Sequence, residues 1–406
     1  MKPNSLAIIN SGLAADLAAF SAFGRSTRVE LPYYRYYQDD VDPIVIPAFV
    51  NKFWAANKRN ANSLHKLSHI DSFEPQLTRF LIERLTRPGQ SVYQPFMKGG
   101  TVVIEAALTK RLPWGSDRNP LSNLMVLPRL NPPTVEQVCQ RLNQIDFIGC
   151  HELPEDLRVF FHETTLKQVA GLRKYLLDRK AVGSMDQVDQ WLSMVVLHQL
   201  AGHSPKFCSI NLKNEPGIPR NSQRPTGAYD QSPLPMDVPA VLLKKTKALL
   251  KYCASKELHL LREFGAQAQL FTSSATETPE IRDGSISLII TSLGADSPTE
   301  SLFGNSAQTW FEALEPSIQQ QRQTQPKLSD TLRELHRVLQ PNGYLAIVAA
   351  KNPPNRWGHI LINCAVPLGF EPLLQLIHDQ KFMRHSALVD LTLRGSRVFL
   401  LRKRLA

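Results

Sequence analysis

Long apolar segments are missing from this chain of 406 residues. No apolar run approaches the roughly 20 residues that a helix needs to span a bilayer, so we expect no membrane partner. The first 20 residues contain one lysine and an apolar stretch that Asn10, Ser11 and Asp16 interrupt. That pattern does not fit a secretory signal, and we expect an ordinary N-terminal segment.

Cysteine is scarce and has no metal-ligand spacing. An odd, sparse set is typical of a reducing cytoplasm, where thiols serve as small core residues. The 11 histidines form no ligand cluster either, since His198 and His203 are five residues apart with Gly202 between them. We therefore expect a cytoplasmic protein without a metal site, whose cysteines are Cys139, Cys150, Cys208, Cys253 and Cys364.

Acidic residues are fewer than basic ones, which leaves a net charge of +11. The excess favours a polyanionic partner, most simply nucleic acid. The alternative is an ordinary basic protein, because many soluble proteins of this charge bind no nucleic acid.

One apolar run organises the chain. Residues 286–290 (ISLII) predict a strand buried on both faces, which stops at Ser292 and Gly294. In an open α/β sheet, ligands bind beyond the carboxyl ends of such strands. Residues 292–295 are therefore the first place to look for chemistry.

A second region has the layout of a nucleotide-type site. Residues 91–96 predict a strand, 97–100 (MKGG) a glycine turn, 101–112 a helix capped by Thr101, and 114–117 a strand that ends at Asp117. Glycines permit close backbone approach, and an acid after the second strand can bind ribose hydroxyls.

Periodicity predicts the remaining elements. A capping box at Thr134 and Gln137 begins a helical stretch. The other expected helices span residues 75–85, 164–177, 188–200, 241–264, 328–339 and 359–368, and the other expected strands span 344–350, 387–393 and 397–401.

Between residues 206 and 239 the chain is rich in proline and predicts a loop. Its basic residues alternate with Phe207 and Tyr229, a pattern typical of nucleic-acid contacts. A solvated connector is an equally good interpretation. The candidate DNA-binding residues are Lys206, Lys213, Arg220 and Arg224.

Taken together, these motifs resemble the DNA amino-methyltransferases, which use S-adenosylmethionine to methylate adenine N6 or cytosine N4. The resemblance covers roughly residues 65–125 and 280–402, and its motifs are 95–101 (PFMKGGT), 115–120 (GSDRNP), 283–292 (DGSISLIITS), 335–344 (LHRVLQPNGY) and 394–402 (RGSRVFLLR). It implies a class I methyltransferase fold: a Rossmann-like, doubly wound α/β sheet with a mostly helical insertion.

The resemblance also assigns roles and domains. It implies that catalysis involves Ser292, Leu293 and Gly294, and that S-adenosylmethionine contacts Gln94, Phe96, Gly99, Gly100, Thr101 and Asp117. The expected regions are an N-terminal arm (1–64), a cofactor half (65–132), a helical insertion that is a possible target-recognition region (133–265), and a catalytic half (266–406).

Three positions depart from the family pattern. Gln94 replaces an acid, and Lys98 replaces a glycine in the turn. The catalytic loop keeps Ser292 but lacks the two prolines and the aromatic ring that stacks on a flipped base. Such a loss costs about 1–3 kcal/mol of stacking.

These departures leave three hypotheses. The first is a methyltransferase-like protein that no longer methylates and serves as a DNA- or partner-binding subunit, for example of a restriction-modification system, beside an active methyltransferase. The second is an active, divergent DNA amino-methyltransferase in which Ser292 holds the target amine. The third, which the sequence favours least, is a methyltransferase for RNA or a small molecule.

Overall fold

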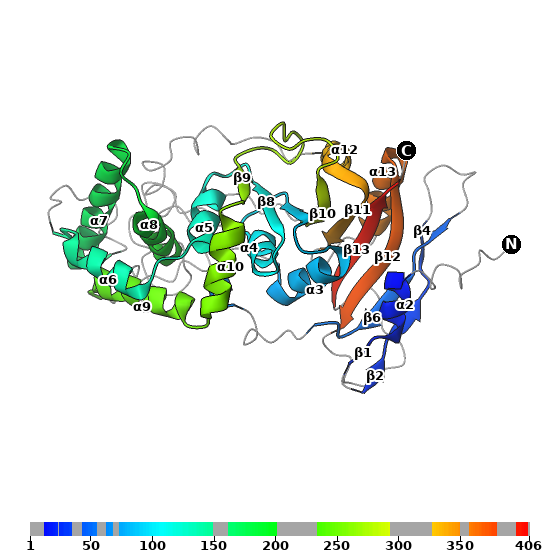
Figure 1. Ribbon diagram of the computed structural model, residues 1–406, viewed down its shortest axis with the longest axis horizontal. Helices are drawn as coiled ribbons and strands as arrows, with labels where there is room; N and C mark the ends of the chain where they lie inside the picture. The colour runs from blue at the N-terminus through cyan, green and yellow to red at the C-terminus, as the bar shows by residue number, and fades with distance from the viewer. Residues whose placement is uncertain are drawn as a thin grey trace, which may run out of the picture.

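The computed structural model describes ten segments of the chain: residues 12–22, 24–34, 43–54, 62–67, 73–148, 161–200, 234–292, 327–349, 357–379 and 395–404. One mixed sheet and the helices on its faces form one part of the molecule, and a group of helices extends from one edge of that sheet (Figure 1). None of the described helices is long and apolar enough to cross a membrane.

Seven strands of the large sheet follow the order β9-β8-β7-β10-β11-β13-β12. Neighbouring strands from β9 to β11 are parallel, and β13 runs antiparallel to both β11 and β12. In chain order this is third, second, first, fourth, fifth, seventh, sixth, which is the class I methyltransferase fold. The predicted fold class is confirmed for strands β7 (Ser91–Gln94), β8 (Leu112–Ser116), β9 (Gln269–Phe271), β10 (Ile286–Thr291), β11 (Leu339–Val348), β12 (Phe370–Asp379) and β13 (Gly395–Lys403).

Strand β10 is buried along its whole length, as its sequence predicted. Leu288 and Ile290 pack in a cluster with helix α3 (Pro75–Leu85), whereas Ile289 packs with helices α12 (Leu328–Val338) and α13 (Trp357–Ala365). Both faces of the strand are therefore covered, which explains a continuous apolar run in place of an alternating one.

Two N-terminal strands extend the sheet beyond β12. Strand β6 (Ala48–Asn51) pairs parallel with β12, and β3 (Arg28–Glu30) pairs antiparallel with β6. Tyr34 is buried, and its hydroxyl donates to Gln375 Oε1 over 2.9 Å, so this tyrosine packs the arm onto the sheet. The other elements of the arm are α2 (Gly12–Ala19), β1 (Ser21–Ala22), β2 (Arg25–Ser26), β4 (Tyr33–Tyr34), β5 (Ile44–Val45) and the 3-10 helix η2 (Ser63–His65).

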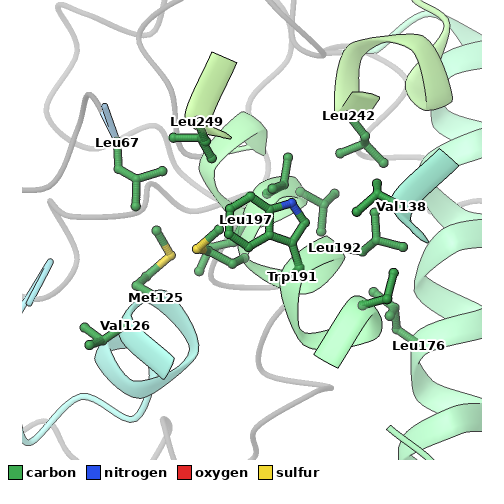
Figure 2. Close-up of a cluster of buried hydrophobic side chains, with 14 of the residues drawn as sticks. Leu67, Met125, Val126, Val138, Leu176, Trp191, Leu192, Leu197, Leu242 and Leu249 are labelled. Atoms are coloured by element: carbon green, nitrogen blue, oxygen red, sulfur yellow. The ribbon is translucent and has the colours of Figure 1, made fainter. Parts of the chain in front are cut away.

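A group of helices, most of which connect β8 to β9, shares one apolar core. Their apolar faces meet around Trp191, which is fully buried and donates to Thr246 Oγ1 over 3.0 Å (Figure 2). The predicted capping box is confirmed, since Thr134 and Gln137 exchange both hydrogen bonds. The helices are α4 (Thr101–Leu108), which precedes β8, and then α5 (Leu121–Leu130), α6 (Val135–Gln144), α7 (Glu163–Ala181), α8 (Gln187–Leu200), α9 (Val238–Leu250) and α10 (Ser255–Gly265).

The prediction of one helix over residues 241–264 was wrong. Helix α9 ends at Leu250, and α10 begins at Ser255. Ser63 Oγ donates to the Leu249 carbonyl over 2.6 Å and accepts from the Tyr252 N–H over 3.1 Å. The break is therefore fixed by a residue distant in sequence, which periodicity does not detect.

The sequence did not predict the strand that pairs with β13. The sequence suggested residues 387–393, which lie outside the described residues, and missed β12 at 370–379. Polar residues and Pro372 interrupt this strand, and its register shifts between Pro372 and Leu374. A bulge of this kind breaks the alternation that marks a half-buried strand. A 3-10 turn, η6 (Val366–Leu368), continues α13 as far as the predicted helix end.

Candidate cofactor site

The candidate site lies where the strand order reverses. Strand β7 has β8 on one side and β10 on the other. The carboxyl ends of these strands therefore meet where ligands bind in open α/β sheets. The sequence assigned residues from all three strand ends to this position. Those after β7 form a turn over residues 95–100, here called the glycine turn.

The glycine turn is held by its own backbone. Phe96 and Lys98 have positive φ angles of 55° and 47°, and Gly100 has 63°. The Met97 N–H donates to the Ser116 carbonyl over 2.9 Å, and the Gly100 N–H donates to the Met97 carbonyl over 2.7 Å. Left-handed conformations at non-glycine residues cost energy, which the surrounding contacts offset.

Gly100 is required by packing between helices. A Cβ atom there would lie 2.2 Å from Val126 Cγ2 on α5. The residue also caps α4 in a left-handed conformation. This close approach is to the protein itself, so the glycine does not need a ligand to explain it.

Gln94 caps helix α4 from the end of β7. Its side chain is 2 % exposed, and Oε1 accepts from the Val102 N–H over 3.1 Å. Gly100 has no side chain for this purpose, so Gln94 satisfies one of the free donors at the helix start. Thr101, the first residue of the helix, is buried beside it.

Asp117 binds the glycine turn to the loop after β8. Oδ2 accepts from the Lys98 N–H over 2.7 Å, and Oδ1 accepts from the Asn119 N–H over 2.8 Å. Burial raises the pKa of this carboxyl, and the hydrogen bonds and the Lys98 charge oppose that shift only in part. The ammonium of Lys98 therefore lies close enough to influence the carboxylate that the resemblance assigns to ribose.

Arg129 lies beneath the glycine turn and is 1 % exposed. Its guanidinium donates to the carbonyls of Gly99, Met125 and Leu64. Burial lowers the pKa of Arg129 to about 9, so the charged form still dominates at neutral pH. This residue joins the turn to α5 and η2, and sequence reasoning missed it. Its signal was a single arginine in an apolar helix.

Glu105 anchors the opposite face of α4. Oε1 contacts His65 Nε2 at 2.7 Å, and Oε2 accepts from Arg79 Nε over 2.8 Å. Burial alone would raise the pKa of Glu105, but the hydrogen bonds and charges of His65 and Arg79 outweigh it and hold the pKa below its usual value. The helix behind the glycine turn is thus fixed on two sides.

Strand β10, which the resemblance assigns to catalysis, reaches the same edge of the sheet. Ser292 follows β10 directly and is half-buried, and Phe96 packs against the cluster that contains Ile289. Among the residues that the structure describes, the buried hydroxyl of Thr291 has no hydrogen-bond partner. Leu293 and Gly294 lie outside the described residues, as do Lys206, Lys213, Arg220 and Arg224.

The structure thus brings together Gln94, Phe96, Gly99, Gly100, Thr101 and Asp117 around one turn. Their roles toward a cofactor remain predictions. What sequence reasoning missed is that the side-chain oxygens of Gln94 and Asp117 are engaged by backbone N–H groups of the chain itself. In the described residues, no group of three or more His, Cys, Asp or Glu side chains could hold a metal ion.

No family model matches this chain, and no curated protein matches it. Solved structures do. TrmN from Thermus thermophilus is 13% identical with a TM-score of 0.31; the match covers 84% of this chain and 52% of TrmN, so the chain spans about half of that protein's length. The rRNA methyltransferase aviRa from Streptomyces viridochromogenes is 11% identical with a TM-score of 0.33, over 87% of this chain and 97% of aviRa.

A structure described as a DNA modification methylase is also among the matches. TTHA0409 from Thermus thermophilus, described as a DNA modification methylase, is 21% identical with a TM-score of 0.19, over 31% of this chain and 48% of its own. These TM-scores are low, so the fold assignment rests on the strand order of the sheet. The matching structures include several S-adenosylmethionine-dependent methyltransferases.

Proposed function

We propose that this chain is a methyltransferase-fold protein, related to the DNA amino-methyltransferases, that no longer transfers methyl groups and acts as a DNA- or partner-binding subunit. The observation that carries the proposal is the engagement of Asp117. Both carboxylate oxygens accept backbone N–H groups, and the Lys98 ammonium lies nearby. An acid that holds ribose would offer these oxygens to the ligand.

Two neighbouring features support the same conclusion. Gln94 supplies no negative charge for the amino acid end of S-adenosylmethionine, and its oxygen is used to cap α4. Lys98 adds a positive charge to the glycine turn that acts on the Asp117 carboxyl, and a positive charge near a sulfonium is unfavourable. The residues of the glycine turn therefore fit the folded chain better than they fit S-adenosylmethionine.

An active, divergent methyltransferase is the second candidate. It is favoured by the position of Ser292, a residue type that the family accepts, directly after the catalytic strand. Each oxygen of Asp117 also keeps a second lone pair for a ribose hydroxyl. In this candidate Ser292 would accept a hydrogen bond from the target amine.

A methyl-transfer assay separates the two. The purified chain is mixed with S-adenosylmethionine carrying a labelled methyl group and with duplex DNA, and binding of the same DNA is followed by fluorescence anisotropy. The proposal predicts DNA binding without label in the DNA. Label in the DNA that disappears in Ser292→Ala would establish the active enzyme instead.

RNA is the control substrate, because the sequence left an RNA methyltransferase as its third hypothesis. Folded RNA replaces DNA in a parallel reaction with the same labelled cofactor. The proposal predicts no label in either nucleic acid. Label in RNA alone would overturn both candidates and leave the RNA hypothesis.

A further inference from the structure

Two lysines and a tyrosine form an exposed basic site between α9 and α10. Tyr252 is 53% exposed, and the Nζ atoms of Lys66 and Lys251 lie 4.7 Å and 5.1 Å from its ring centroid. We call these three residues the lysine elbow. Both distances are within the range of a cation–π contact, which orients an ammonium group over the ring.

The elbow is built by contacts between distant parts of the sequence. Ser63 Oγ bonds the end of α9 and the Tyr252 N–H, and Cys253 Sγ donates to Asn62 Oδ1 over 3.3 Å. These bonds place η2 and the following Lys66 against the break between the helices. The fold therefore brings both lysines to the same ring, although Lys66 is distant from Lys251 in the sequence.

Positive charge prevails around the elbow, although Glu257 follows it and accepts from the Ala254 N–H over 3.0 Å. Between residues 238 and 256 the sequence has no Asp or Glu, and its lysines are Lys244, Lys245, Lys247, Lys251 and Lys256. Lys245 Nζ also donates to the Lys66 carbonyl over 2.7 Å. Neither Lys66 nor Lys251 forms an ion pair with any residue that the structure describes.

We infer that the lysine elbow binds the phosphate backbone of duplex DNA. Each ammonium group attracts negative charge, and the phosphates of a DNA backbone can contact both lysines around the exposed ring. The tyrosine hydroxyl can donate to a phosphate oxygen as well. The inference rests on the proposed DNA binding and names a surface for it in the described helices, apart from the loop that the sequence suggested.

Other polyanions that the elbow could bind can be distinguished from DNA. An acidic protein segment would also match the charge. DNA fits better because the positive charge is compact and close to one exposed ring, and duplex DNA presents a charge about every 1.7 Å of its axis. The test therefore includes an acidic peptide, polyglutamate, as a competitor.

The experiment compares two double variants of the full chain. Lys66→Gln/Lys251→Gln removes two charges from the elbow, and Lys327→Gln/Arg333→Gln removes two exposed charges at α12 as a matched control. Helices α9 and α12 lie far apart in Figure 1, so the control changes net charge equally at a distant place. Circular dichroism checks that each variant is folded.

Affinity for a fluorescent DNA duplex is measured from about 50 to 200 mM salt, the range over which phosphate contacts are most apparent. Loss of two phosphate contacts should reduce the slope of log affinity against log salt by roughly 2 in the elbow variant, with little change in the control. Tyr252→Ala should weaken binding about threefold, since it frees both ammonium groups from the ring.

Three results would overturn the inference. If log affinity falls with log salt at the same slope in the elbow variant and the wild type, DNA does not bind at the elbow, and the proposed function is unaffected. Equal losses in both double variants would show an effect of net charge alone. An elbow variant that loses only polyglutamate binding would assign the surface to an acidic protein. Absence of DNA binding by the wild type would instead refute DNA binding by this protein as a whole.

Discussion

The glycine turn and the lysine elbow differ in where their polar groups are directed. Around the turn, Gln94, Asp117 and Arg129 bond backbone groups of the chain. At the elbow, Lys66 and Lys251 surround an exposed ring and have no ion-pair partner among the described residues. The comparison shows that polar groups at the position that the resemblance assigns to a cofactor bond the chain itself, whereas the charges of the elbow are exposed.

The largest effect is expected at Gly100. Gly100→Ala should lower the free energy of unfolding by about 4 kcal/mol, because the added Cβ meets Val126 and the residue has a left-handed conformation. Gly89→Ala is the matched control: it has a positive φ but nothing within 4 Å of the added atom, and should cost only about 1–2 kcal/mol. Urea unfolding of both variants measures the difference, and equal losses would show that packing at Gly100 is unimportant.

Glu105→Gln should cost about 3 kcal/mol at pH 7, because it removes a buried carboxylate from its contacts with His65 and Arg79. The folded-state pKa of Glu105 is lowered, so its contribution is present above the unfolded pKa and is lost as pH falls through the folded pKa. The difference from wild type should therefore shrink at acid pH.

Denaturant unfolding at several pH values, with exposed Glu83→Gln as the control, measures this effect. The control should change stability by less than about 0.5 kcal/mol. A difference between wild type and Glu105→Gln that stays constant down to acid pH would contradict the role of the ion pairs.

Asp117→Ala tests directly whether a polar side chain stabilises the glycine turn. It leaves the Lys98 and Asn119 N–H groups without their acceptor, which should cost about 2 kcal/mol. Asp178→Ala, at an exposed helical pair with Lys174, should cost less than about 0.5 kcal/mol. If Asp117→Ala unfolds at the same urea concentration as the wild type, the carboxylate does not hold the turn.

The pH dependence of Asp117 has the opposite sign to that of Glu105. Its pKa is raised in the folded state, so its ionisation lowers stability as pH rises from the unfolded pKa through the folded one. The stability of the Asp117→Ala variant should not fall over this pH range. If the stability of the variant falls as much as that of the wild type, another group causes the fall.

The smallest effect on stability is expected at the elbow. Lys66→Gln/Lys251→Gln should change the free energy of unfolding by less than about 0.5 kcal/mol, since both side chains are exposed. Thermal unfolding at equal salt measures it. A loss of several degrees would place these lysines in the scaffold and erase the contrast with the turn.

The sequence predicted the strands that have uniform environments. Strand β10 is buried on both faces, so its apolar run could be recognised without tertiary information, and the strand ends one residue beyond the predicted 286–290. The glycine turn and the strand that ends before Asp117 were likewise located from residue type and spacing.

The elements that were missed depend on distant contacts. The end of α9 is set by Ser63, and β12 is recognised only through its pairing with β13 and β6. The same holds at the site, because the sequence located Gln94 and Asp117 but could not show that each side chain accepts a local N–H. Propensity describes short segments and contains no information about such partners.

Calorimetric titration of the wild-type chain with S-adenosylmethionine tests the central claim most directly. If the polar groups of the glycine turn serve the scaffold, no binding heat should appear that fits a dissociation constant tighter than about 1 mM, which corresponds to about 4 kcal/mol of binding free energy. A one-to-one isotherm in the micromolar range would contradict the account, and would assign Asp117 and the glycine turn to the cofactor.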